Sequence, residues 1–114
     1  KVTVSDLSRS DMAENVEDAF RYNKLVLASA SYDGGVFPVM QDFLLHLKAK
    51  NYQNRTIAII ENGSWAPSAA RTMKSILETM KNLTVLDNIV TIKSTVKPET
   101  VTALETLADD IIKA

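Results

Sequence analysis

Apolar residues gather in four short clusters that have the length and spacing of β-strands. The clusters at 25–28 (LVLA) and 57–60 (IAII) are continuous, whereas those at 2–4 (VTV) and 89–93 (IVTIK) alternate with polar residues. Continuous runs are typical of strands covered on both faces, and alternating runs are typical of strands at a sheet edge. We therefore expect the strands at 25–28 and 57–60 to be central and the other two to be peripheral.

Four further segments carry apolar residues at the spacing of an amphipathic helix. Ser10 suits the N-cap of the first helix, Pro67 suits the first turn of the third, and Pro98 lies near the start of the fourth. Strands that alternate with helices predict parallel pairing through right-handed crossovers, which gives a three-layer, doubly wound α/β sheet. The expected apolar faces are Met12, Val16, Ala19 and Phe20; Val36, Val39, Met40, Phe43, Leu44 and Leu47; Ala69, Ala70, Met73, Ile76, Leu77 and Met80; and Val101, Leu104, Leu107, Ala108 and Ile111.

Two loops follow the expected central strands, and both are rich in small and polar residues. They span 29–35 (SASYDGG) and 61–66 (ENGSWA), and each carries one aromatic residue, Tyr32 or Trp65. Ligands of open α/β sheets bind beyond the carboxyl ends of the central strands, where these loops lie. Two aromatic rings and flexible glycines at one edge suit a flat, carbonyl-rich heterocycle. Ordinary strand–helix turns and an indole that covers the core explain the same residues without a ligand.

The overall composition excludes several other functions. The chain has 114 residues, a net charge of −1 and no cysteine, which suits one domain without disulfides or thiolate chemistry in a reducing, cytoplasmic compartment. Its basic residues are scattered, so we expect no nucleic-acid partner. No apolar stretch is long enough for a membrane span. The single histidine, His46, is expected to be a solvated surface residue, and the sequence predicts no metal site.

Three stretches of the chain resemble a known family. SASYDGGVFP (29–38), NRTIAIIENGSWAPSAA (54–70) and MKSILETMK (73–81) are similar to the flavodoxin-like FMN domain of the flavodiiron proteins, also called A-type flavoproteins. The similarity covers essentially the whole chain, and ENGSWAP is its most specific part. The family's second flavin loop reads close to S-P-T-Y-N-G-G, from which this chain differs at three positions. The resemblance implies that the FMN ring and ribityl chain lie against Ser29, Ser31, Tyr32, Asp33 and Gly34, and against Asn62, Gly63, Ser64 and Trp65.

The resemblance also implies a function. In that family FMN accepts electrons from a donor such as rubredoxin or a flavin reductase. It passes them to a diiron site that reduces oxygen or nitric oxide, which lies in a metallo-β-lactamase-like domain and is often reached across a homodimer. This chain is therefore expected to be the electron-transfer flavin module of an oxidoreductase and not to be catalytic alone.

The start of the chain departs from the family. Flavodoxin-like domains begin with a strand and a Ser/Thr-rich loop that wraps the FMN phosphate, and the first cluster here, VTV, resembles the family's second strand. The strand order 2-1-3-4-5 then requires a missing strand between VTV and LVLA. We expect an N-terminal truncation of about 30 residues, the size of one strand–helix unit. Without the phosphate loop, FMN is expected to bind weakly or not at all.

Two other functions match parts of the sequence. A receiver-like signalling domain has the same architecture, with Asp33 beyond a central strand and Lys97-Pro98 after the last one, but it has no place for ENGSWAP. A cofactor-free association module would use the sheet edge that the missing strand leaves open, because unpaired edges favour pairing with other chains.

Overall fold

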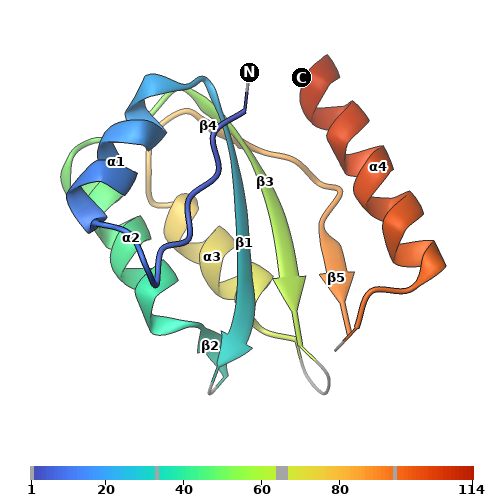
Figure 1. Ribbon diagram of the computed structural model, residues 1–114. Coiled ribbons are helices and arrows are strands. Elements are labelled where there is room, and N and C mark those ends of the chain that lie inside the picture. Colours follow the sequence, from blue (N-terminus) through green and yellow to red (C-terminus); the bar gives the residue numbers. More distant parts are fainter. Residues whose placement is uncertain (1, 33, 64–66, 94) are drawn as a thin grey trace.

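The computed structural model describes residues 2–32, 34–63, 67–93 and 95–114, and it shows the predicted alternation of strands and helices (Figure 1). The elements, in chain order, are α1 (Met12–Arg21), β1 (Lys24–Tyr32), β2 (Gly35–Val36), α2 (Pro38–Ala49), β3 (Arg55–Asn62), α3 (Ala69–Leu77), β4 (Leu83–Val85), β5 (Val90–Ile92) and α4 (Pro98–Lys113). None of the described helices is long and apolar enough to cross a membrane.

The sheet is mostly parallel, and β3 lies at its centre. β3 pairs with β1 on one side, from Lys24↔Thr56 to Ala30↔Asn62, and with β4 and β5 on the other. The sequence predicted one final strand at 89–93. Instead, β4 and β5 lie one after the other along β3, so two short strands share this edge. β2 forms a short antiparallel hairpin with β1.

Helices cover both faces of the sheet, which confirms the three-layer α/β prediction (Figure 1). Ile57 and Ile59 of β3 are fully buried in the larger core, together with residues of α1, α2 and α3. Ala58 of β3 points to the opposite face and packs with Val90 and Leu107 beneath α4. The continuous apolar run of β3 is therefore explained by burial on both faces.

β1 is covered on one face only. Leu27 is buried in the larger core, whereas Val26 is 46% exposed and Ala28 is also exposed. The expectation that the LVLA run is covered on both faces is wrong for this strand. The reason is that α4 packs over β3 and β5 and leaves the outward side chains of β1 uncovered.

The N-terminal cluster does not form the predicted strand. Residues 2–4 have no strand assignment, and Val2 and Val4 are 85% and 88% exposed. A cleft of about 660 Å³ lies between residues 2–5 and β1. Among the described strands, none pairs with residues 2–4.

Two smaller expectations also need correction. Val36, which the helical pattern placed in the second helix, belongs to β2, and α2 begins at Pro38, whose fixed φ suits a first helical turn. The N-cap of α1 is Asp11, and the hydroxyl of the preceding Ser10 donates to the carbonyl of Asp6 at 2.6 Å.

Candidate functional site

The carboxyl ends of β1 and β3 lie side by side, as the parallel topology predicted. Their register pairs Ser29 with Glu61 and Ala30 with Asn62, so the two candidate loops leave the sheet next to each other. The described residues brought to this edge are Ser29, Ser31, Tyr32, Gly34, Asn62 and Gly63. The predicted site residues Asp33, Ser64 and Trp65 lie outside the described residues.

The two loops approach closely at Gly63. A Cβ atom at this position would lie 2.9 Å from Oγ of Ser31 and 3.1 Å from Cα of Pro67. The N–H of Gly63 also donates to the carbonyl of Ile92 in β5 at 3.0 Å. A Cβ at position 63 would be too close to Ser31 and Pro67, so glycine allows the two loops to approach this closely.

Ser31 connects β1 to the start of α3. Its Oγ accepts hydrogen bonds from the backbone N–H groups of Ser68 and Ala69, at 2.8 and 3.1 Å. The hydroxyl of Ser68 donates in turn to the carbonyl of Gly35 at 2.7 Å. The first N–H groups of a helix lack intrahelical partners, so a side chain from the neighbouring strand caps α3.

Glu61 is an anchoring residue to which the sequence assigned no role. It is 7% exposed; Oε1 accepts the N–H of Ala70 at 3.0 Å, and Oε2 accepts the hydroxyl proton of Thr91 at 2.7 Å. A carboxylate at a helix N-terminus is favoured by the free amides and the helix dipole. The sequence signal was an acidic residue at the end of a buried strand just before a helix, but it did not identify the partners.

Tyr32 presents an aromatic ring at the same edge. The ring is 54% exposed and meets the ring of Phe37 edge-on, with 5.7 Å between centroids and 77° between planes. Gly34, in the hairpin that follows, has a φ of 77°, a conformation that glycine adopts at little cost. The hairpin and Phe37 therefore fix an accessible ring beside the loop that carries Asn62 and Gly63.

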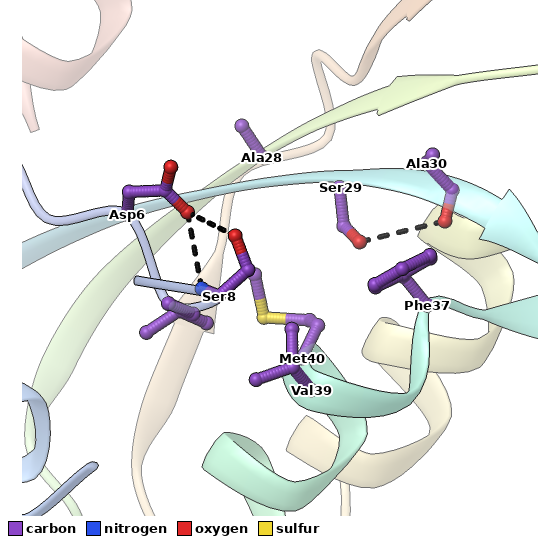
Figure 2. A pocket seen from close by; sticks show the side chains of 9 residues that line it. Asp6, Ser8, Ala28, Ser29, Ala30, Phe37, Val39 and Met40 are labelled. Carbon is purple, nitrogen blue, oxygen red and sulfur yellow. Dashed lines mark hydrogen bonds between the residues drawn. The ribbon is translucent and has the colours of Figure 1, made fainter. Parts of the chain in front are cut away.

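A pocket of about 320 Å³ lies beside the end of β1 (Figure 2). Its walls come from the N-terminal loop at Asp6 and Ser8, from Ser29 of β1, and from the start of α2. The Ser8 hydroxyl and backbone N–H donate to Asp6 Oδ1 at 2.7 and 3.0 Å and hold the pKa of Asp6 below its ordinary value. The pocket therefore carries a negative charge on one wall.

The single histidine lies away from this edge. His46 is an exposed residue of α2, as predicted, and its Nδ1 lies 2.7 Å from the carbonyl of Asp42. Within the described ranges there is no group of three or more side chains that could hold a metal ion.

No family model and no curated protein matches the sequence. Several solved structures match the fold. A rubredoxin oxygen:oxidoreductase from Desulfovibrio gigas has a TM-score of 0.75 and 16% identity, over 90% of this chain and 31% of that chain. Flavodoxin 1 from Bacillus cereus has a TM-score of 0.78 and 18% identity, over 99% and 78% of the two chains. A flavodiiron protein from Thermotoga maritima has a TM-score of 0.69 and 24% identity, over 88% and 24%.

These comparisons show that the chain has a flavodoxin-like fold. It spans most of the length of the flavodoxin but about a third of the oxygen:oxidoreductase and about a quarter of the flavodiiron protein.

Proposed function

We propose that the chain binds FMN at the carboxyl ends of β1 and β3 and transfers electrons within a flavodiiron-type flavoprotein. The main support is the close packing of the two candidate loops at Gly63 and Ser31, beside the exposed ring of Tyr32. These residues belong to the two stretches that resemble the family's flavin loops, and the flavodoxin-like fold supports a flavin as the ligand.

Each described residue has a distinct part in this proposal. The exposed ring of Tyr32 packs against the flavin ring, and Ser29 and Asn62, near the carboxyl ends of β1 and β3, contact the ribityl chain. Ser31 and Glu61 hold the start of α3 in place, because their oxygens are bonded to its first amides. FMN supplies the redox chemistry when it is bound, and the chain positions it and excludes water.

The three remaining site residues complete the proposal, although they lie outside the described residues. Trp65 is proposed to face Tyr32 across the flavin ring, and Ser64 to contribute to the same loop. Asp33 would place a carboxylate near the ring and would disfavour an anionic reduced flavin. These roles come from the resemblance alone.

The described residues suit the flavin ring better than the phosphate. The pocket beside Ser29 is lined by the carboxylate of Asp6, which is ionised at neutral pH, and the hydrogen bonds from Ser8 lower its pKa further. A phosphate next to this group would be repelled. We therefore propose that this chain by itself binds FMN weakly.

The redox partners are proposed from the resemblance and from the neighbours. A donor such as rubredoxin or a flavin reductase would reduce the flavin. The acceptor would be a diiron site in a metallo-β-lactamase-like domain, reached within the same chain or across a homodimer. The likeness to a rubredoxin oxygen:oxidoreductase and to a flavodiiron protein supports this choice.

Titration of FMN against the chain, followed by quenching of flavin fluorescence, tests the proposal. We expect saturable quenching with a dissociation constant above one micromolar. Tyr32→Ala should weaken binding about 2- to 10-fold, which is the value of one aromatic contact. Tyr22→Ala is the matched control, because it removes a tyrosine side chain just before the opposite end of β1. Absence of quenching at millimolar concentrations would contradict flavin binding, and a sub-micromolar constant would contradict weak binding.

A further inference from the structure

Asn62 and Gly63 form a pair of residues that is chemically reactive in a flexible chain. Asn62 is the only asparagine of the sequence that a glycine follows. The backbone nitrogen after an asparagine can attack the side-chain amide, and glycine leaves this nitrogen unshielded because it has no Cβ. Asparagine is for this reason a thermolabile residue. The stability of the pair therefore depends on whether the fold lets the two groups meet.

The end of β3 holds this pair between two neighbouring strands. In the register of the sheet, Asn62 lies opposite Ala30 of β1 and opposite Ile92 of β5. The N–H of Gly63 donates to the carbonyl of Ile92 at 3.0 Å. The attacking species is the deprotonated nitrogen, so a hydrogen bond that keeps the proton in place suppresses the attack. The paired backbone also cannot rotate to bring the nitrogen onto the side-chain carbon, which ring closure requires.

Pairing with β5 protects the reactive atoms, whereas burial does not. The side chain of Asn62 is exposed, and Gly63 is only half-buried. Water and solvent bases therefore reach this end of β3 as soon as the hydrogen bond to Ile92 opens.

The protecting strand is short and lies beneath α4 (Figure 1). β5 is three residues long and is attached through two side chains in particular. Val90 is buried with Leu107 of α4, and the hydroxyl of Thr91 donates to Oε2 of Glu61 at 2.7 Å. Short elements with few buried side chains open by local fluctuation at low energetic cost.

We propose that Asn62 is a site of spontaneous backbone modification, which the pairing of β3 with β5 keeps unreactive. When β5 separates, the Gly63 nitrogen loses its proton to a solvent base and attacks Cγ of Asn62. The new N–C bond closes a succinimide ring, and the side-chain nitrogen takes up a proton and leaves as ammonia. Water then opens the ring at either carbonyl, which gives aspartate or isoaspartate. Water is the only co-reactant, and the proposal does not depend on flavin binding.

The products would keep β5 from returning to its position. Isoaspartate adds a methylene group to the main chain before Gly63, which displaces the N–H that Ile92 accepts. Either product also places a negative charge directly after the buried carboxylate of Glu61, and like charges repel. A modified chain would therefore stay open at this edge of the sheet.

Mass spectrometry of proteolytic peptides, followed over days at neutral pH, measures the modification of Asn62. We expect the folded chain to react at least about tenfold more slowly than the same chain unfolded in urea, because only its open fraction is reactive. Asn82 and Asn88, each followed by a branched apolar residue, are internal references that should react far more slowly in both states. Equal rates for Asn62 in the folded and unfolded chains would overturn the proposal.

Variants of the two short strands make the test specific to β5. Val90→Ala should speed the modification about tenfold, because it removes packing that holds β5 in place. Val85→Ala is the matched control and should leave the rate unchanged, since β4 pairs with the opposite end of β3. Thr91→Val, which removes the hydrogen bond to Glu61, takes the place of Val90→Ala if that variant unfolds. Equal rates for the β5 variant and the control would overturn the proposal.

Hydrogen exchange of the Gly63 amide, measured by NMR, reports the opening independently of the modification. Its exchange rate should rise in the β5 variant by the same factor as the modification rate, and should stay unchanged in Val85→Ala. The amide of Ile59, in the middle of β3, should stay protected in both variants. Faster modification without faster exchange at Gly63 would overturn the proposal.

Discussion

At the residue scale, the candidate site depends on a few short contacts between loops. Gly63, Ser31 and Glu61 each contact a residue that is distant in sequence. These contacts fix the start of α3 against the ends of β1 and β3. Substitutions at these positions should therefore affect stability and site geometry together.

Gly63→Ala should destabilise the chain by about 1–3 kcal/mol, because its Cβ would lie 2.9 Å from Oγ of Ser31 and the loops would have to separate. Gly35→Ala is the matched control, since its Cβ would meet atoms only at ordinary distances of 3.7 Å or more. Urea denaturation monitored by circular dichroism gives both free energies of unfolding. Equal losses for the two variants would show that the close contact has no energetic effect.

Tyr52 should make stability depend on pH in the alkaline range. Burial raises the pKa of Tyr52 from 10.0 to about 12, although the charge of Arg55 lowers it in part. The unfolded chain then loses this proton first, so the contribution is complete below pH 10 and is lost as pH rises toward 12. The free energy of unfolding should fall by about 1.4 kcal/mol per pH unit in this window.

Tyr52→Phe isolates that effect, because it removes a hydroxyl that has no hydrogen-bond partner among the described residues. The variant should be at least as stable as the parent at pH 7, since no buried bond is lost. For the parent and the variant, the free energy of unfolding is plotted against pH. The difference between the two curves from pH 10 to 12 measures the contribution of Tyr52 to stability. Parallel curves would contradict the prediction.

At the element scale, Glu61 joins three elements, because its carboxylate lies at the end of β3 and binds α3 and β5. Glu61→Ala should cost about 2–3 kcal/mol, since the buried N–H of Ala70 loses its charged acceptor. Glu105→Ala, on the exposed surface of α4, is the control and should change stability by less than about 0.5 kcal/mol. Chemical denaturation compares the two, and the prediction fails if their losses are equal.

The sequence predicted the central elements well because their signals are local. Burial is predicted directly by the run IAII and by the helical spacing of Met40, Phe43 and Leu44. The structure confirms both predictions. Strand pairing is non-local, so the division of the last strand into β4 and β5 and the missing pairing of residues 2–4 could not be read from those segments.

The candidate site was predictable to the same extent. Topology alone brought the loops after β1 and β3 together, as the register of Ser29 with Glu61 confirms. The bond from Ser31 to α3 and the partners of Glu61 depend on side-chain geometry across the sheet, which residue types do not specify. The proposed contact between Tyr32 and Trp65 stays a prediction.

At the scale of the whole molecule, the hollow beside β1 and the pocket beside Ser29 share Leu7, Ala28 and Met40. The pocket lined by Asp6 therefore borders the cleft, whereas the side with Tyr32 is built by the hairpin of β1 and β2. In the proposed site, the contributions of the flavin ring and of the phosphate to the binding free energy can therefore be measured separately.

Riboflavin and FMN should accordingly bind this chain with dissociation constants within about threefold of each other, since Asp6 gives the phosphate no favourable contact. Parallel fluorescence titrations at one ionic strength provide the comparison. Asp6→Asn should shift the ratio toward FMN, with Asp42→Asn on α2 as the control. A hundredfold preference of the unmodified chain for FMN would contradict this reading of the pocket.

The small buried contact between α4 and the rest of the chain affects the order in which the elements unfold. Leu107 is its one fully buried side chain, and Lys24 reaches its last turn through the carbonyl of Ile111. An element that shares so little interior with the rest detaches at low energetic cost. Sub-global opening should therefore release α4 while β3 and the larger core persist, and this would briefly uncover Ala58 and Val90 to solvent.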